Sequence, residues 1–217
     1  MTILALLAIA LAPGVCIAIY IYLKDKHERE PVSLLVKSFF FGFVAIIITL
    51  LVSIPADFLI PIDEEDLSEQ AVHAFILVAL VEEASKFLFV RGVLYYNNNF
   101  NEPFDGIVYS VMVGMGFATL ENIFYVVDGG WGTALLRMFT AVPAHASFAV
   151  LMGFYVGKAK FEHKRVLFNS FFALSSATLF HGAYDYFFFI NFVPGMGFGA
   201  IVSLVTGVLL AFKAIQI

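Results

Sequence analysis

Charged residues are scarce in this chain, and cysteine is almost absent. Only 13% of the 217 residues are Asp, Glu, Lys or Arg, whereas 61% are hydrophobic. Soluble globular domains carry about 25% charged residues, so this mixture excludes an ordinary soluble protein. The single cysteine, Cys16, excludes an intramolecular disulfide and a cysteine-based zinc site. The composition therefore predicts an integral membrane protein.

Seven apolar segments are long enough to cross the hydrocarbon core of a bilayer, which takes about 20 helical residues. They cover residues 2–23, 33–54, 71–91, 104–127, 134–157, 166–190 and 196–214. The last segment is the least regular, because Pro194 and Gly195 stand before it. The sequence predicts an all-α, polytopic membrane bundle of seven transmembrane helices, organised as a single domain over residues 1–217.

Basic residues follow every second segment, and the intervening connections contain neither Lys nor Arg. The basic residues between or after the segments are Lys24, Lys26, Arg29, Arg91, Lys158, Lys160, Lys164, Arg165 and Lys213. Because Lys and Arg are retained on the cytoplasmic side of a membrane, the N-terminus is expected outside and the C-terminus in the cytoplasm. The acidic stretch 57–69 then lies outside, as a solvated connection that accounts for much of the formal charge of −5.

Several ionisable residues nevertheless lie inside the apolar segments, where charge is costly and usually marks a functional site. They are Glu82, Glu83, Lys86, Asp105, Glu121, Arg137, His145, His181 and Asp185. At a helical rise of about 1.5 Å per residue, the glutamates and histidines lie roughly 9 to 17 Å below the external ends of their segments. Asp105 stands at the cytoplasmic end and is not expected to join them. Four consecutive helices should therefore converge on one cavity nearer the external face.

The spacing of these residues favours hydrolytic chemistry. Glu82 and Glu83 precede Lys86 by four and three residues, so either carboxylate can share a helix face with the lysine. A glutamate held in this way can act as a general base for water. His145 or His181, from other helices, could stabilise an oxyanion or shuttle a proton. Water activated by such a set can hydrolyse a peptide bond.

Other routes to peptide hydrolysis in a membrane have motifs that this sequence lacks. There is no HExxH, the helical zinc-protease motif, and no GxSxG around a nucleophilic serine. Tyr184 and Asp185 form one YD pair, but no GxGD motif supplies the second aspartate of a diaspartyl site. By elimination, glutamate is the expected catalytic residue.

Four motifs together resemble the PrsW family of bacterial intramembrane proteases, which is distantly related to the CAAX prenyl protease and bacteriocin-processing superfamily. They are EEASK at 82–86, FDGIVYSVMVGMGFATLENIFY at 104–125, HASF at 145–148 and HGAYD at 181–185. The resemblance covers roughly residues 70–190, in the family's order. Where the wider superfamily carries FxxxH, this chain has Phe117 and Glu121, so the histidine's role does not transfer directly to Glu121.

The resemblance implies a glutamate-dependent protease of the bacterial plasma membrane. Its substrate would be a single-span membrane protein, an anti-sigma factor, which it cuts first and on the external side to start release of a sigma factor. The catalytic residues would be Glu82, Glu83, His145 and His181. The residues expected to support the site are Lys86, Glu121, Asn122, Tyr125 and Asp185. The expected partners are this substrate and the lipid bilayer, and no nucleic acid is expected to bind.

Three alternatives stay open on the sequence. The same Glu and His set could form the proton relay of a coupled transporter, although no repeat or inverted pair of broken helices is visible. No cofactor is expected, but zinc bound by Glu83, His145 and His181 would define a metal-dependent hydrolase. A scaffold in which the charges form a structural ion pair is the third reading.

Overall fold

The computed structural model describes residues 3–25 and 28–216, and within those residues the regular structure is entirely helical. Residue 2 of the first predicted segment and the basic residue Lys26 lie outside the described residues. The helices are α1 (Ile3–Lys24), α2 (Val32–Leu59), α3 (Leu67–Val72), a π-helix (His73–Leu80), α4 (Val81–Gly92), α5 (Asp105–Phe139), α6 (Ala141–Phe161), α7 (Val166–Phe189) and α8 (Gly197–Ile215). Short 3₁₀ turns lie at Leu94–Tyr96 and His163–Arg165.

Five helical stretches among the described residues are long and apolar enough to cross a membrane. They are Leu4–Lys24, Val32–Leu59, Asp105–Phe161, His163–Phe189 and Gly197–Ile215. The third contains both α5 and α6, and the predicted segment 71–91 is divided among α3, the π-helix and α4. The protein is therefore a multi-pass, all-helical membrane protein, while the count of seven and the orientation of the termini stay predictions.

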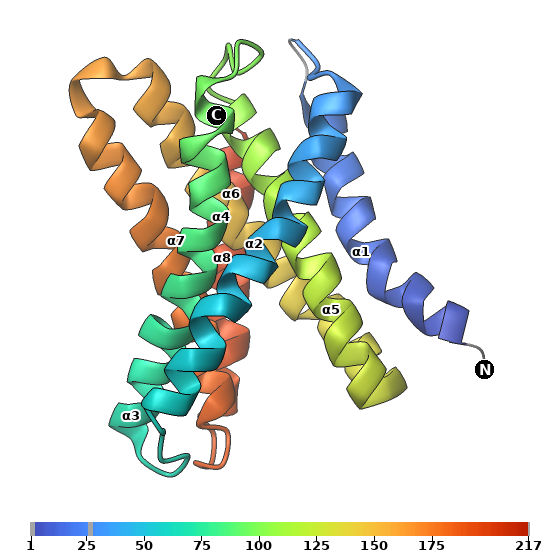
Figure 1. Ribbon diagram of the computed structural model, residues 1–217, viewed down its shortest axis with the longest axis vertical. Helices are drawn as coiled ribbons and strands as arrows, with labels where there is room; N and C mark the ends of the chain where they lie inside the picture. The colour runs from blue at the N-terminus through green and yellow to red at the C-terminus, as the bar shows by residue number, and fades with distance from the viewer. Residues whose placement is uncertain (1–2, 26–27, 217) are drawn as a thin grey trace.

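The connections of the bundle gather at two ends, as Figure 1 shows. The basic connections that follow α1, α4 and α6 lie at one end, which we call the basic end. The acidic connection between α2 and α3 lies at the other end, beside the connection between α7 and α8. We call this the acidic end. Asp66 begins α3 by accepting hydrogen bonds from Ser68, and these bonds lower the pKa of its carboxyl.

The first half of α5 is the axis of the bundle. All fifteen residues from 105 to 119 are buried, and this half packs against α1, α2, α4 and α6. A helix that is apolar on every side must be covered on every side. The outer helices instead expose large apolar side chains, such as Phe58 and Leu167, which are more than four-fifths exposed. Such a surface suits contact with lipid.

A reversal of the chain at Gly130 divides α5 into two antiparallel parts. Gly130 has φ of 66° and ψ of −151°, a backbone conformation that residues other than glycine rarely adopt. Arg137 contacts Glu121, although sixteen residues of straight helix would separate them by about 24 Å. The part after Gly130 therefore returns alongside the part before it and leads into α6, in agreement with separate segments at 104–127 and 134–157.

Glycines let α5 and α6 approach closely at the basic end. A Cβ added to Gly153 would collide with the backbone of Gly106, and one added to Gly106 would collide with Gly153. Because each position faces backbone and not a flexible side chain, neither collision can be relieved by a change of rotamer. The close contact fixes the relative position of the two helices that carry Glu121 and His145.

Replacing Gly153 with alanine is expected to lower the free energy of unfolding by about 1 to 3 kcal/mol, because the inserted methyl group forces the helices apart. The matched control is Gly132→Ala, since a Cβ at Gly132 has nothing within 4 Å. Thermal unfolding in detergent compares the two variants. Equal unfolding midpoints would contradict close packing at Gly153.

Candidate active site

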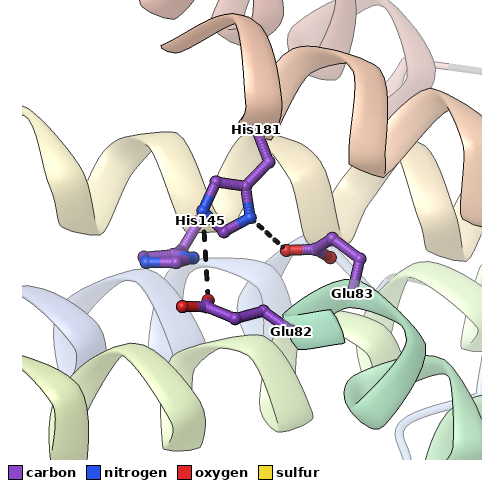
Figure 2. Close-up of side chains that lie close together, drawn as sticks. All are labelled: Glu82, Glu83, His145 and His181. Carbon is purple, nitrogen blue, oxygen red and sulfur yellow. Dashed lines mark hydrogen bonds and ion pairs between the residues drawn. The ribbon is translucent and has the colours of Figure 1, made fainter. Parts of the chain in front are cut away.

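The predicted glutamates and histidines meet inside the bundle, on four helices. Glu82 and Glu83 lie on α4, His145 on α6 and His181 on α7, and all four side chains are buried. Figure 2 shows the two carboxylates facing the imidazole of His181, with His145 beside them. The structure thus brings together the residues whose similar depths in the membrane predicted that they would meet. The fourth helix, α5, contributes Glu121, which lies next to His145.

Glu83 is the most enclosed member of the cluster. Its side chain is 1% exposed, and its Oε1 accepts hydrogen bonds from Lys86 Nζ at 2.7 Å and from His181 Nδ1 at 2.8 Å. One oxygen is thus shared by a lysine from the next turn of α4 and a histidine from α7. Glu83 is suited to fixing the positions of both groups.

Glu82 is held more loosely. Its Oε2 lies 3.3 Å from Lys86 Nζ and 3.9 Å from His181 Nε2, and its side chain is 10% exposed. A separation of 3.9 Å is too long for a direct hydrogen bond, but one water molecule can bond both atoms. The two adjacent glutamates therefore differ in their surroundings, because neighbouring side chains on a helix point about 100° apart.

His145 joins Lys86 to Glu121. Its Nδ1 lies 3.4 Å from Lys86 Nζ, and its Nε2 lies 2.9 Å from Glu121 Oε2. Because an ammonium group only donates, Nδ1 must accept, and the ring proton is therefore on Nε2 and is donated to Glu121. This arrangement fixes both the tautomer and the plane of His145.

His181 faces carboxylates with both ring nitrogens. Nδ1 lies 2.8 Å from Glu83 Oε1, and Nε2 lies 3.1 Å from Asp185 Oδ2. Such a position suits an imidazole that carries two protons, since each nitrogen then donates to an oxygen. Asp185, one of the residues expected to support the site, thus contacts His181 directly. The ring of Phe148 stacks on His181 with 4.9 Å between centroids and an angle of 17°.

Arg137 is the partner of Glu121, a contact that the sequence analysis did not predict. Its Nη2 donates to Glu121 Oε2 at 2.7 Å, and its Nε donates to Asn122 Oδ1 at 3.0 Å. The other end of the Asn122 amide donates to the carbonyl of Ala10 in α1. The contacts form a chain from Arg137 through Glu121 to His145, and Asn122 ties it to α1.

Tyr125 lies at the edge of the cluster and not within it. Its side chain is half exposed, and its ring lies 3.9 Å from the guanidinium carbon of Arg137. Its contact with the site is therefore indirect, through that arginine. Phe117, one turn before Glu121, takes an inner position instead, since Lys86 Nζ lies 3.9 Å from the centroid of its ring.

Two features next to Glu82 were not visible in the sequence. The π-helix His73–Leu80 ends immediately before α4, and its wider turns change the direction in which the following side chains point. Such π-turns are frequent at functional sites. The second feature is a hydrogen bond between the hydroxyl groups of Ser85 and Thr49, 2.9 Å apart, which connects α4 to α2.

Asp105 lies away from this cluster, at the basic end, as expected. Its Oδ2 accepts bonds from the backbone N–H groups of Asn101 and Glu102, both at 2.8 Å. Asp25 and Glu30 lie in the same region, and Tyr109 donates a very short hydrogen bond to Glu30. Burial raises the pKa of the Glu30 carboxyl, and this hydrogen bond acts in the opposite direction.

Replacing Arg137 with glutamine is expected to reduce kcat by about tenfold to a hundredfold, because Glu121 and His145 lose the contact that orients them. KM should change little, since Arg137 lies behind the two residues. Arg29→Gln, which alters an exposed arginine of a connection, is the matched control. The prediction fails if Arg137→Gln and Arg29→Gln give the same kcat for a membrane substrate.

A buried set of glutamates and histidines inside a membrane-spanning helical bundle suits an intramembrane hydrolase, in which such groups activate water. The chain matches the profile of the PrsW family of intramembrane metalloproteases over residues 30–212. The chain therefore belongs to the PrsW family and is an intramembrane protease. This membership decides against the transporter and scaffold readings.

Curated relatives agree with the family assignment. The chain is 38% identical to Protease PrsW of Geobacillus kaustophilus over 84% of this chain and 79% of the relative. It is 34% identical to Protease PrsW of Bacillus subtilis over 84% and 82% of the two chains. Protease PrsW of Clostridioides difficile is also 34% identical, over 97% and 88%. No solved structure is similar enough to match.

Proposed function

We propose that this protease makes the first cut in a single-span membrane protein, an anti-sigma factor, on the external side of the bacterial plasma membrane. The position of the cluster supports an external cut. Glu121 is nine residues from the reversal at Gly130, and His181 is eight residues from the end of α7 at Phe189, or roughly 12 to 14 Å in each case. Both distances lead to the acidic end, which is the external end under the predicted orientation.

The observation that carries the chemical proposal is the pair Glu82 and His181, whose facing atoms can share one water molecule. In this proposal Glu82 is the general base, because its carboxylate is the more accessible and has the fewer hydrogen bonds. Removal of a proton from water produces the nucleophile that attacks the carbonyl carbon of the peptide bond. Glu83 holds His181 and Lys86 in place during this step.

Charge that develops on the substrate carbonyl oxygen needs a donor. The proposal assigns this task to the ammonium of Lys86, which is released from Glu82 once that carboxylate takes the proton from water. The proton that Glu82 has taken from water then passes to the leaving nitrogen. His145 stands beside His181, with 5.0 Å between the two imidazole centroids. The general base, the donor to the carbonyl oxygen and the source of the proton for the leaving nitrogen thus all belong to the cluster.

The PrsW family is described as one of metalloproteases, and Glu82, Glu83, His145 and His181 offer donor atoms of the kind that bind a metal ion. Their ligand atoms lie within 4.8 Å of one another, and two carboxylates with two imidazoles form a donor set that suits zinc. However, Lys86 Nζ lies 2.7 to 3.4 Å from atoms of Glu82, Glu83 and His145. A fixed ammonium there takes the place of the cation, and the arrangement does not fit a metal.

We therefore expect the purified protease to contain far less than one zinc ion per chain by elemental analysis. Incubation with a chelator should leave its rate of cleavage unchanged, because Lys86 supplies the positive charge of the site. Stoichiometric zinc, or a loss of activity that added zinc restores, would overturn this part of the proposal.

The substrate proposal is tested with the native protein in lipid vesicles and a set of single-span membrane proteins, anti-sigma factors among them. Mass spectrometry of the products locates each cut. We expect cleavage of anti-sigma factors in the external half of the span or just outside it. Cleavage confined to the cytoplasmic half, or to unrelated single-span proteins, would contradict the proposal.

A further inference from the structure

A cavity of about 830 Å³ lies at the basic end of the bundle, on the opposite side from the catalytic cluster. The ends of α1, α6 and α8 and the start of α5 form its walls. Most of the lining is apolar and aromatic, and Tyr20, Phe104, Phe154 and Phe212 contribute to it. None of the residues of the candidate active site reaches the cavity.

The polar part of the lining carries one positive charge without an acidic partner. Lys158 Nζ lies 3.5 Å from Glu162 Oε1, so that lysine is already paired. The Glu102 carboxylate is grouped with Asp25 and Asp105. Lys24, in contrast, is exposed and forms no ion pair with any carboxylate of the described residues, and its Nζ lies 5.4 Å from the centroid of the Tyr20 ring. The cavity therefore offers a cation above an aromatic wall.

The position of the cavity relative to the membrane decides what can enter it. Leu23 and Phe212 beside it are about half exposed, which places this part of the surface against lipid. Lysines and tyrosines at the ends of transmembrane helices lie at the level of the lipid headgroups. The cavity thus opens where a phosphate and the upper part of an acyl chain are both present. A free phosphate ion would leave the aromatic wall uncovered.

We propose that this cavity binds an anionic glycerophospholipid, with its phosphate at Lys24 and an acyl chain along Tyr20, Phe104 and Phe212. Basic pockets between transmembrane helices are a known means of holding lipid headgroups. A volume of about 830 Å³ is enough for a headgroup and the first part of a chain. An anionic lipid is preferred over phosphatidylethanolamine, because Glu162 of the lining, which could otherwise attract the ammonium of that headgroup, is already paired with Lys158. The proposal does not depend on the proteolytic activity.

The test uses native mass spectrometry of the delipidated protein with phosphatidylglycerol as the probe. We expect one phosphatidylglycerol molecule to bind and diacylglycerol, which lacks the phosphate, to bind at least tenfold more weakly. The double variant Lys24→Ala with Lys158→Ala should bind phosphatidylglycerol about tenfold or more weakly, since each lysine at the membrane surface contributes to attraction of an anionic lipid. The single variant Lys24→Glu should show the same loss.

The matched control is Lys37→Ala, which removes an exposed lysine of α2 outside the cavity and should leave binding unchanged. Circular dichroism confirms that each variant is folded before it is compared. Equal binding of phosphatidylglycerol and diacylglycerol would overturn the proposal. Native-like binding of phosphatidylglycerol by folded Lys24→Glu protein would also overturn it. The same holds if Lys37→Ala lost as much binding as Lys24→Glu.

Discussion

Replacing Glu82 with glutamine is expected to reduce kcat for cleavage of a membrane substrate about a thousandfold, within the range of 10² to 10⁴ that general bases contribute. Glutamine has the same shape as glutamate but cannot take a proton from water. The bonds that Glu83 makes with Lys86 and His181 stay in place, so the protein should fold normally. Single-turnover cleavage in lipid vesicles measures the effect.

The matched control for this substitution is Glu64→Gln, which makes the same change at an exposed residue of the acidic connection. Its kcat should equal that of the native protein. Both variants must give the same elution volume on gel filtration as the native protein. If folded Glu82→Gln protein kept a tenth or more of the native kcat, Glu82 would not be the general base.

Replacing Lys86 with methionine should cause the largest loss of stability, about 3 to 5 kcal/mol, because removal of one partner leaves buried charge without compensation. Methionine keeps much of the side-chain volume, so little of the loss comes from a cavity. Lys86 Nζ lies 3.3 Å from Glu82 Oε2 and 2.7 Å from Glu83 Oε1. The unfolding midpoint in detergent measures the change.

The double variant Lys86→Met with Glu83→Gln separates charge from packing. Neutralising Glu83 removes the closest uncompensated charge and should restore more than half of the lost stability. Lys37→Met, at an exposed lysine of α2, should have no effect. If the double variant were less stable than Lys86→Met alone, loss of charge compensation would not explain the effect of the single substitution.

The convergence of the site was predictable because a membrane restricts where charges can go. An ionised side chain inside an apolar segment has few partners apart from another polar side chain at the same depth. Equal depth on adjacent helices was therefore enough to place Glu82 and Glu83 near His145 and His181. The same argument predicted that Asp105 lies apart from the cluster, because it stands at the end of α5 that is farthest from Glu121 and the reversal at Gly130.

The details of the contacts were less accessible to the sequence. Hydropathy gives the depth of a residue but not the rotation of its helix, so Tyr125 was expected to support the site although its ring lies at the edge of the cluster. The partner of Arg137 depends on the reversal at Gly130, where two glycines precede the only tryptophan. An arginine shortly after such a turn is a signal from which the contact between Arg137 and Glu121 could have been predicted.

The π-helix before Glu82 has no pattern that marks it in one sequence. Residues 73–80 are as apolar as an ordinary membrane helix. Phe75 from this segment lies against Gly182 of α7, one residue after His181. The direction in which Glu82 points follows a π-helix that residue spacing does not reveal, which is why its role could not be separated from that of Glu83 by spacing alone.

The most direct measurement is to locate the scissile bond of a bound substrate in the Glu82→Gln protein. A photoreactive amino acid is placed in the substrate at the mapped cut site, and mass spectrometry identifies the residues of the protease to which it couples. We predict attachment within residues 82–86, 117–125, 145–148 or 181–185. Attachment confined to the basic end or to the lipid-facing surface of α8 would contradict a catalytic role for the cluster.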